Sequence, residues 1–550
     1  MNKFREVNTL NFTPTFREDM VRVSDGTLLY TRTMFPEDYD TSKTYPVVFH
    51  RTPYEPPTSR SPFDPSYLKP PFTDFLEHGY IIVNQHSRGS GSSEGVFRNM
   101  MKYERTDSLD TLGWIRAQSW YNGEIYLYGA SYKSYIHSTY VGTNPPDVKA
   151  VALAVMPANQ FHICYERNTP KHDLYTLWLA RYFMRNHVNA KEKFIMMGKA
   201  LKYRPLITVD QRVYGEELPE IYNIFNNNHP GDDFWHADEG FKYATHAPED
   251  IKIPLLLVGG FYDIHYCGTL DYWKRLNSEV REKSALYIGP WWHSMETPPE
   301  HESLLPNSYH AAVEVEWFDH IRLGTPLTHV AKGQATYYRA GDGWLNASDI
   351  GTRANSRLAL YPTYGGALCS VPSIGSQTYK YDPEYPAYFP GGANVFQSGN
   401  GGMQPQPAPA FRPDVLSFVS DEFDTNVALD GKIHATLEVS SDCPDTAFLV
   451  RVDVIRDGTA WCQRDTIVSI SDLCKNYVAG QRALLEFDLD QIAWTLRAGD
   501  RLRIDVSSSN FPTYNAHSNT SDYWALADHT EIAHNTLYFE HTKFEFDVEI

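Results

Sequence analysis

The chain has 550 residues, of which 42% are hydrophobic, so it is long enough to bury a large core and to form two or three domains. A net charge of −19 disfavours a nucleic-acid partner and an anionic membrane surface. The N-terminal segment has no apolar signal-peptide core, and the chain has no apolar run of about 18 residues that would predict a membrane span. We therefore expect a cytoplasmic protein without a membrane partner.

The six cysteines are widely spaced and form no CxxC pair. This spacing argues against a zinc site and against a dense disulfide framework. Buried free thiols in a cytosolic protein are the favoured interpretation. One pairing stays open, because Cys443 and Cys462 would meet if they lie on neighbouring strands.

The first 157 residues alternate between predicted strands and helices. A β-hairpin is expected at residues 21–34, around the turn pair Asp25-Gly26. Buried strands are expected at 45–50, 80–84, 125–128 and 148–155, and helices at 72–79 and 104–118. This alternation indicates βαβ units and a parallel sheet.

A glycine- and serine-rich loop at residues 88–95 follows the second buried strand. It lacks the Gly-Lys-Ser/Thr ending that a phosphate-binding P-loop requires. The sequence therefore disfavours phosphate binding there.

The pattern changes at residues 158–248, where long aromatic and Met-containing helical stretches include 174–188 and 191–201. In a hydrolase this insertion would be a helical cap that supplies the substrate pocket, and an ordinary helical subdomain packed on the sheet is the alternative. The alternation then resumes at 249–332, with strands at 253–260 and 285–289 and helices at 269–279 and 311–323.

Residues 333–550 carry no helical signal and are expected to form an all-β jelly-roll sandwich. Alternating segments predict strands at 358–361, 432–439, 447–455, 483–488 and 501–507. The Gly- and Pro-rich residues 391–409 predict an irregular loop within this half. The predicted fold class is thus α/β with a parallel sheet (1–157 and 249–332), which the serine turn described next identifies as an α/β-hydrolase domain, with a helical cap (158–248) and a jelly-roll domain (333–550).

The segment EIYLYGASYKSY, residues 124–135, predicts a short strand, a tight turn at Gly129-Ala130-Ser131 and the start of a helix. This is the strand–nucleophile–helix elbow of an α/β-hydrolase, which lifts a serine hydroxyl to the edge of the sheet. Lys133 stands where a glycine is usual two places after the serine, and a lone GxS is a weak signal.

Three candidates, Ser131, Asp263 and His293, occur in the chain order that α/β-hydrolases use. Each follows a predicted core strand, and the carboxyl ends of parallel strands gather their loops at one edge of the sheet. His293 would take the proton of Ser131 during attack and return it to the leaving group. Asp263 would fix the tautomer of that imidazole, so order and context together predict a catalytic triad.

Other acidic and histidine residues near Asp263 and His293 fit the triad less well. Asp271 lies further along the helix after Asp263, His265 does not follow a separate strand, and His301 lies in a polar loop. A metal site built from His293, Glu296, His301 and His310 would lack HExxH spacing. The triad chemistry itself needs no cofactor and no metal.

A tetrahedral intermediate also needs two oxyanion donors. The Tyr132 backbone N–H, at the start of the helix, is the first candidate. Tyr54 follows the strand at 45–50 and could offer its phenolic hydroxyl. A tyrosine after proline is more often a packing residue, so that alternative stays open for Tyr54.

Seven segments in order carry a resemblance to a known family. They are RTPY (51–54), SRGSGSSEGVF (87–97), GASY (129–132), GGFYD (259–263), IGPWWH (288–293), FRPDVLSF (411–418) and GDRLRIDVSSSNFPTY (499–514). On these segments the chain resembles the CocE/NonD family of serine hydrolases. That family includes cocaine esterase, α-amino acid ester hydrolases and X-prolyl dipeptidyl peptidases.

The resemblance implies the nucleophile Ser131, the partners Asp263 and His293, and an oxyanion hole from Tyr54 and Tyr132. It also implies the helical cap, the jelly roll and, from the family only, a homo-oligomer. An aromatic acyl pocket is expected from the cap and from Phe261, Trp291 and Trp292.

The chain also departs from the family pattern. His86 replaces an aspartate, Ser134 replaces a glycine, and Lys133 replaces an apolar or acidic residue. The acidic cluster that holds a substrate ammonium group is not identifiable, which puts an α-amino substrate in doubt. Its candidates are Glu166, Asp173, Asp232 and Asp233.

We therefore expect a serine hydrolase that cleaves a small ester, amide or short peptide through an acyl-enzyme. An acyltransferase using the same triad and an X-Pro-type peptidase are the alternatives. A carbohydrate-binding protein with an inactive hydrolase half is a third alternative, which the intact Ser131, Asp263 and His293 set argues against.

Overall fold

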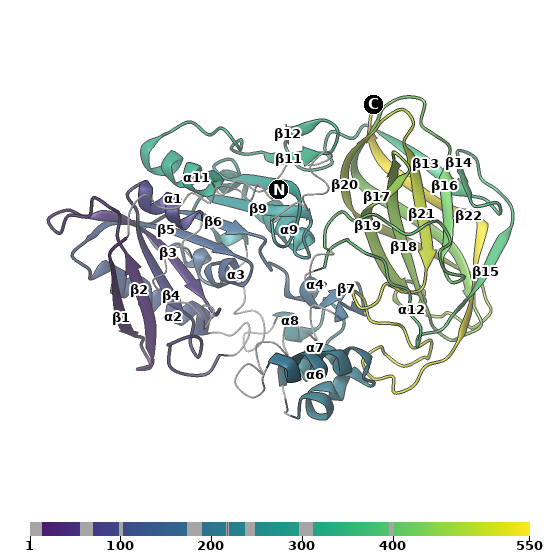
Figure 1. The fold of residues 1–550 in the computed structure, drawn as a ribbon, viewed down its shortest axis with the longest axis horizontal. Coiled ribbons are helices and arrows are strands. Elements are labelled where there is room, and N and C mark those ends of the chain that lie inside the picture. Colours follow the sequence, from purple (N-terminus) through teal and green to yellow (C-terminus); the bar gives the residue numbers. More distant parts are fainter. Residues whose placement is uncertain are drawn as a thin grey trace.

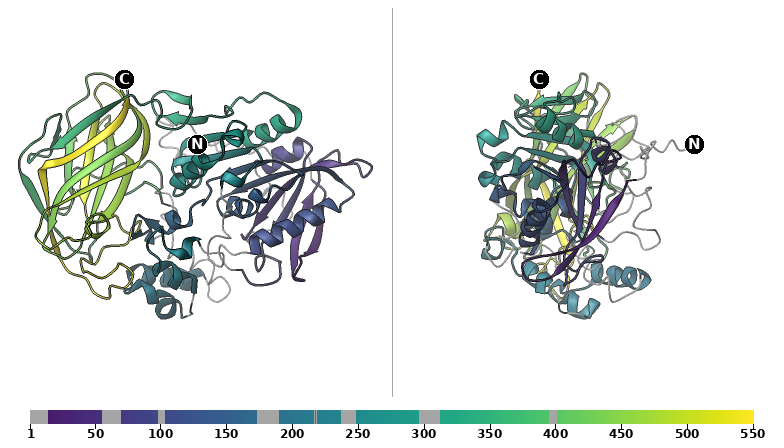
Figure 2. Two further views of the ribbon diagram at one scale, coloured as in Figure 1. Left: turned by 180° about the vertical axis from the view of Figure 1, so that it is seen from behind. Right: turned by 90° about the vertical axis from the view of Figure 1, so that its left-hand side faces the viewer.

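The computed structural model describes residues 14–54, 70–97, 103–172, 190–215, 217, 219–236, 248–295, 312–394 and 401–550. Two large units lie side by side, an α/β unit and an all-β unit (Figure 1). A group of short helices lies along one side of the junction between them, which the view from behind also shows (Figure 2).

The α/β unit is built on one ten-stranded sheet with the order β1-β2-β4-β3-β5-β6-β9-β10-β11-β12. The strands are β1 (Phe16–Arg22), β2 (Leu28–Met34), β3 (Tyr45–Thr52), β4 (Ile81–His86), β5 (Tyr121–Ala130), β6 (Val148–Ala154), β9 (Leu255–Tyr262), β10 (Ala285–Trp292), β11 (Ala335–Arg339) and β12 (Gly343–Ala347). The strands from β4 to β11 in this order pair in parallel, and β1, β2 and β12 pair antiparallel at the two ends. The predicted hairpin and parallel sheet are therefore confirmed.

Helices cover both faces of this sheet, as its fully buried strands require. Phe49 of β3 packs in one core with α2 (Tyr103–Arg116) and α9 (Tyr266–Arg275). The next residue back, Val48, faces a second core with α1 (Phe72–Glu77) and α11 (Ala312–Leu323). Successive strand residues point to opposite faces, so the run of apolar residues in β3 serves both cores.

Short elements connect β6 to β9. They are α4 (Gln160–Cys164), β7 (Tyr165–Glu166), β8 (Thr169–Pro170), α6 (Ala190–Lys202), the 3-10 helix Leu206–Thr208, the π-helix Asp210–Tyr214, α7 (Pro219–Phe225), α8 (Asp233–His236) and the 3-10 helix Pro248–Asp250. The helix predicted at 191–201 is confirmed as α6, whereas the one predicted at 174–188 lies outside the described residues. This segment also contacts the all-β unit, because Tyr165 and Tyr523 hydroxyls lie 2.9 Å apart.

The all-β unit, called the β-domain below, contains β13 to β22. Its strands are β13 (Ser356–Pro362), β14 (Ala367–Cys369), β15 (Ser376–Tyr381), β16 (Leu416–Ser420), β17 (Val427–Ser441), β18 (Ala447–Arg456), β19 (Thr459–Ser469), β20 (Ala483–Leu496), β21 (Arg501–Ser507) and β22 (Ala533–Glu549). They pair in the order β19-β18-β21-β16-β14-β13-β22-β17-β20, and β15 pairs with β22. Each strand predicted between 358 and 507 is confirmed, and the fold class is an α/β-hydrolase-like domain followed by an all-β domain.

The boundary between the two units is marked by a buried polar contact. Asp430 of the β-domain accepts hydrogen bonds from Tyr337 (2.6 Å) and Arg339 (2.8 Å) of β11. β11 and β12 follow residue 332 in the chain, but they extend the first sheet, because β11 pairs with β10 and β12 pairs with β11. The domain limits at 157, 248 and 332 stay a prediction.

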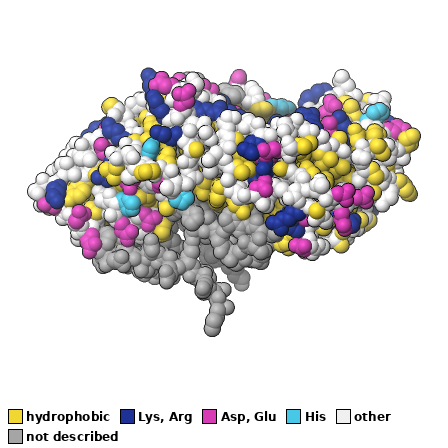
Figure 3. Space-filling model, turned by 90° about the horizontal axis from the view of Figure 1, so that it is seen from above, with side chains coloured by type: hydrophobic (Ala, Val, Ile, Leu, Met, Phe, Trp, Pro, Cys, Tyr) yellow, Lys and Arg dark blue, Asp and Glu magenta, His cyan; other side chains and the backbone are white. Residues whose placement is uncertain are grey.

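All six cysteines carry free thiols, so Cys443 and Cys462 do not pair. Cys462 lies inside β19 opposite Asp453, whereas Cys443 lies between β17 and β18 and is not on a strand. No helix in the described part of the chain is both long and apolar enough to cross a membrane. On the face in Figure 3, basic and acidic side chains are interspersed over the described surface.

Candidate active site

Ser131 lies between the end of β5 and the start of α3 (Tyr132–Ser138), in the predicted elbow. Its backbone adopts φ 58° and ψ −132°, a conformation that residues with a β-carbon rarely adopt. Its N–H donates to Ala154 of the neighbouring strand at 2.9 Å. A β-carbon on Gly129 would lie 2.5 Å from the Lys133 backbone, so only glycine fits there. Ser134 donates its hydroxyl to the Ser131 carbonyl at 2.5 Å and so replaces the usual glycine without a clash.

The structure brings the three predicted triad residues into one hydrogen-bonded chain. Ser131 Oγ lies 2.9 Å from His293 Nε2. His293 Nδ1 lies 2.7 Å from Asp263 Oδ1. The Asp263 side chain is fully buried, and that of His293 is 15% exposed. These are the distances at which an imidazole can accept the serine proton while a carboxylate orients it.

Charges around Asp263 favour its ionised form. Burial alone would raise the pKa of Asp263, but the adjacent His293 holds this pKa below its usual value. His265, which was a competitor for the base, instead lies edge-on to His293, with ring centroids 5.1 Å apart. Burial lowers the pKa of His265 to about 3, so His265 stays neutral beside the triad. Asp271 is not near the site and forms an ion pair with Arg275 on α9.

Two glycines shape the strand ends that carry Asp263 and His293. A β-carbon on Gly260 would lie 2.2 Å from the Trp291 carbonyl oxygen, and one on Gly289 would lie 2.1 Å from the Trp291 ring. The β9–β10 register shifts between Gly289 and Trp292, which is a β-bulge just before His293. The close packing of Trp291 on both glycines therefore sets the direction in which the chain enters His293.

A buried polar network, which the sequence did not reveal, lies beneath the elbow. Tyr132 donates its hydroxyl to Glu104 at 3.3 Å. Arg51 lies 3.5 Å from the same carboxylate and donates to Ser108 at 2.7 Å. Burial raises the pKa of Glu104 despite the nearby Arg51. Arg51 stands in the RTPY segment, but Glu104 gave no signal because it looks like any acidic residue in the first turn of a helix.

The two oxyanion candidates lie near the elbow. The Tyr132 N–H belongs to the first turn of α3, where amide groups have no acceptor within the helix. Tyr54 is half-buried and packs with Phe97, Tyr132, Tyr135 and Ile136. The ammonium of Lys133 lies 5.9 Å from the centre of the Tyr54 ring. Burial lowers the pKa of Lys133 to about 8.

The three aromatic residues predicted for the acyl pocket have different surroundings. Trp291 is 1% exposed and Phe261 is 5% exposed, and both belong to hydrophobic cores. Trp292 is half-buried and packs against Gly401 and Gly402 of a β-domain loop. These positions favour packing roles for Trp291 and Phe261.

The acidic candidates for an ammonium site do not form an open cluster. Glu166 lies 3.3 Å from Lys171 and accepts a hydrogen bond from Thr466 at 2.7 Å. Asp232 accepts from the His229 backbone at 2.9 Å. Asp233 is exposed at the start of α8, and Asp173 lies outside the described residues.

The metal site weighed above cannot be placed, because Glu296, His301 and His310 lie outside the described residues. Within the described part of the chain, Glu438, Glu540 and His541 gather on the β-domain. Arg482 already pairs with both glutamates there, at 3.1 Å and 3.4 Å. Arg482 therefore already binds both carboxylates of this cluster and offsets part of their charge.

Two family models match the chain. Residues 25–295 match the model described as X-Pro dipeptidyl-peptidase (S15 family). Residues 331–544 match the model described as X-Pro dipeptidyl-peptidase C-terminal non-catalytic domain. The chain therefore belongs to the S15 peptidase family of hydrolases, with the C-terminal domain that accompanies it.

Known proteins that are similar to the chain carry names with different activities. The cocaine esterase of Rhodococcus sp. (strain MB1 Bresler) is 25% identical over 541 residues, covering 91% of this chain and 92% of that protein. An aminopeptidase from a marine sediment Thaumarchaeota archaeon has a TM-score of 0.79 at 19% identity, covering 100% of this chain and 98% of that chain. An α-amino acid ester hydrolase has a TM-score of 0.78 at 19% identity, with both chains covered fully at 100%. The two structures share the fold of both domains.

The glycine geometry gives a test that pairs two neighbouring residues. We expect Gly260→Ala to lower kcat/KM for an ester by about 100-fold, because its β-carbon meets the Trp291 backbone and displaces His293. Gly259→Ala is the matched control, since its β-carbon meets the Ile288 side-chain tip at 2.9 Å and the Thr269 side chain at 3.5 Å, and no backbone atom within 4 Å among its three nearest neighbours. Steady-state hydrolysis and thermal unfolding of both variants would be compared. Equal activity in the two variants would contradict this account of the strand ends.

Proposed function

We propose that this protein hydrolyses an ester or amide bond through a covalent acyl-enzyme on Ser131. The observation that carries the proposal is the unbroken chain from Ser131 Oγ to His293 at 2.9 Å and on to Asp263 at 2.7 Å. The family supports hydrolysis, because both matched models describe domains of a peptidase and the relative from Rhodococcus is an esterase. Six free thiols agree with a reducing compartment such as the cytoplasm.

The reaction follows from the positions of these atoms. Ser131 Oγ attacks the substrate carbonyl carbon while His293 Nε2 takes the hydroxyl proton. Asp263, held ionised, stabilises the imidazolium that forms. His293 then gives the proton to the leaving alcohol or amine, and the acyl group remains on Ser131. A water molecule attacks this acyl-enzyme by the same route and releases the acid.

The oxyanion of each tetrahedral intermediate would be held by the Tyr132 N–H and the Tyr54 hydroxyl. Support for Tyr132 comes from its place in the first turn of α3, directly after the nucleophile. Support for Tyr54 comes from its position in the aromatic cluster around Tyr132 and Tyr135. The ammonium of Lys133 near its ring would favour donation from the phenol.

The charges near the site bear on whether the substrate carries a free α-amino group. The names of the relatives divide between an esterase, an aminopeptidase and an α-amino acid ester hydrolase. A substrate ammonium would need an unpaired carboxylate close to the triad. Glu166 is already paired with Lys171, and the neutral His265 lies edge-on to His293. Asp490, which borders the same cavity as Asp263, accepts a hydrogen bond from Cys267 and forms no ion pair among the described residues. We infer that neutral acyl esters and amides are substrates.

Acyl-enzyme formation can be measured directly with an activated aryl ester. We expect a rapid burst of phenol release, close to one per active site, followed by slower turnover. Ser131→Ala should abolish the burst and lower kcat by at least about 10⁴-fold, because no nucleophile remains. Ser138→Ala is the control, since this buried hydroxyl on the same helix bonds only to the Tyr135 carbonyl. A burst that persists in Ser131→Ala would contradict the proposal.

The oxyanion role of Tyr54 makes a separate prediction. We expect Tyr54→Phe to lower kcat by roughly 10²–10³-fold with little change in KM, because the hydroxyl would act mainly in the transition state. Tyr135→Phe is the matched control, since the buried Tyr135 hydroxyl in the same cluster has no hydrogen-bond partner among the described residues. Steady-state kinetics on one ester would compare them. A near-normal kcat for Tyr54→Phe would reduce Tyr54 to a packing residue.

A further inference from the structure

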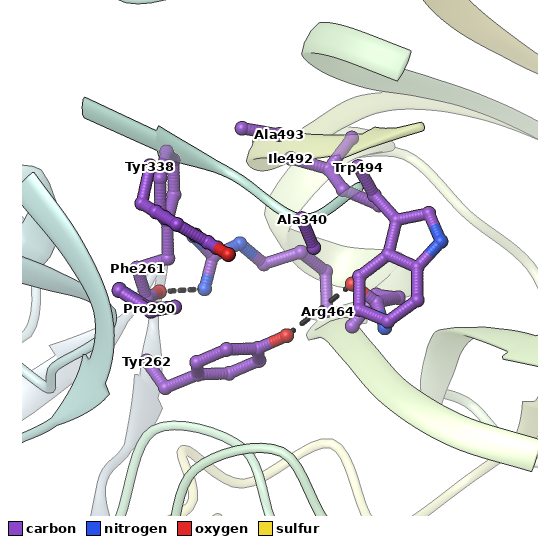
Figure 4. A pocket seen from close by; sticks show the side chains of 10 residues that line it. Phe261, Tyr262, Pro290, Tyr338, Ala340, Arg464, Ile492, Ala493 and Trp494 are labelled. Atoms are coloured by element: carbon purple, nitrogen blue, oxygen red, sulfur yellow. Dashed lines mark hydrogen bonds between the residues drawn. The ribbon is translucent and has the colours of Figure 1, made fainter. Parts of the chain in front are cut away.

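One arginine of the β-domain, Arg464 of β19, contacts strand β9 of the hydrolase sheet, close to Asp263 in sequence. Its Nη1 donates to the carbonyl of Phe261, near the end of β9. Its Nε donates to the carbonyl of Gln491 at 2.9 Å, which ties the same side chain to β20. Figure 4 shows the side chain extending from the β-domain towards Phe261, with the hydrogen bond to its carbonyl.

A β-bulge in β19 explains how Arg464 reaches that strand. Val452 pairs with Arg464 and the next residue, Asp453, pairs with Cys462, so Gln463 is an extra residue in β19. Bulges redirect side chains that would otherwise alternate between the two faces of a sheet. Both consecutive residues contact β9, because Gln463 Oε1 also accepts a hydrogen bond from the Tyr262 hydroxyl at 3.2 Å (Figure 4).

The guanidinium of Arg464 is buried against residues that flank the catalytic carboxylate in sequence. The residue is 7% exposed, and its charged group lies 4.9 Å from the ring centre of Tyr266. The rings of Tyr262 and Phe261 lie at 5.6 Å and 5.7 Å. Among the described residues Arg464 forms no ion pair with a carboxylate. The guanidinium group therefore interacts with two backbone carbonyls and with the faces of these aromatic rings.

The backbone contacts of this segment link Arg464 to Asp263. Asp263 donates its N–H to the Gly260 carbonyl at 3.0 Å, and Tyr266 donates to the Asp263 carbonyl at 3.1 Å. The Phe261 carbonyl that Arg464 binds lies within this turn, two residues before Asp263. Asp263 and Arg464 also border the same cavity between the two domains.

We propose that Arg464 is a positioning residue, through which the β-domain fixes Asp263 in hydrogen-bonding distance of His293. The proposal rests on the function proposed above for the triad. Asp263 Oδ1 lies 2.7 Å from His293, and the backbone N–H of His265, two residues further along the same segment, also hydrogen-bonds to this carboxylate. The placement of the carboxylate therefore depends on the backbone of this segment, and Arg464 anchors that backbone at the Phe261 carbonyl.

Steady-state kinetics distinguish a residue that positions Asp263 from one that only joins the two domains. We expect Arg464→Ala to lower kcat by about tenfold to hundredfold while KM stays within about twofold, because substrate binding groups are not touched. Arg464→Lys should lose nearly as much, since an ammonium cannot bind both carbonyls with the same geometry. Gln463→Ala is the matched control, because it removes an interdomain bond to the Tyr262 side chain and leaves the Phe261 carbonyl held. Guanidinium ion at tens of millimolar should restore part of the kcat of Arg464→Ala only.

A crystal structure of Arg464→Ala completes the test without using activity. We expect Asp263 to move out of hydrogen-bonding distance of His293, beyond about 3.5 Å. An intact Asp263–His293 bond, an unchanged kcat, or an equal loss in Gln463→Ala would each overturn the positioning role. An inactive wild-type enzyme would instead refute the proposed function, and the Asp263–His293 distance in the variant would still decide the role of Arg464.

Discussion

The strained backbone of Ser131 is the constraint on which the rest of the site depends. Its φ of 58° costs on the order of 1–3 kcal/mol, so the surrounding structure must hold it in place. Gly129 provides the clearance, the Ala154 carbonyl binds the Ser131 N–H, and Ser134 bonds its carbonyl. These contacts join β5, β6 and α3, which is why the Ser131 hydroxyl stands at the carboxyl edge of a parallel sheet.

The partners of the serine depend on packing in a different way. Asp263 and His293 leave neighbouring strands whose ends are shaped by Gly260, Gly289 and the buried Trp291. The β-domain contacts the same region through Arg464 and through the Asp430 contact to β11. The second domain is thus part of the structure that holds Asp263 and His293, because it binds polar groups of the hydrolase sheet that would otherwise face water.

Much of the fold and the candidate site could be predicted from the sequence, because both are encoded locally. Apolar runs and turn pairs located the hairpin, the parallel strands from β3 to β10 and five strands of the β-domain, and chain order pointed to Ser131, Asp263 and His293, which the structure brings within hydrogen-bonding distance of one another. Features that depend on distant partners could not be predicted. β11 and β12 extend the first sheet because of pairing with β10, Trp291 is buried because two glycines make room, and Arg464 contacts a residue 203 positions away. Cys443 and Cys462 looked pairable only because the position of Cys443 outside a strand cannot be seen in the sequence.

The most direct test of the central claim is the site of covalent modification by a fluorophosphonate, read by intact mass and peptide mapping. Such a probe reacts with a serine whose hydroxyl proton is removed by a neighbouring base. Our account predicts a single adduct, on Ser131, formed much faster in the wild type than in His293→Ala. No adduct, or an adduct on another serine, would contradict the assignment of Ser131, His293 and Asp263 as a working triad.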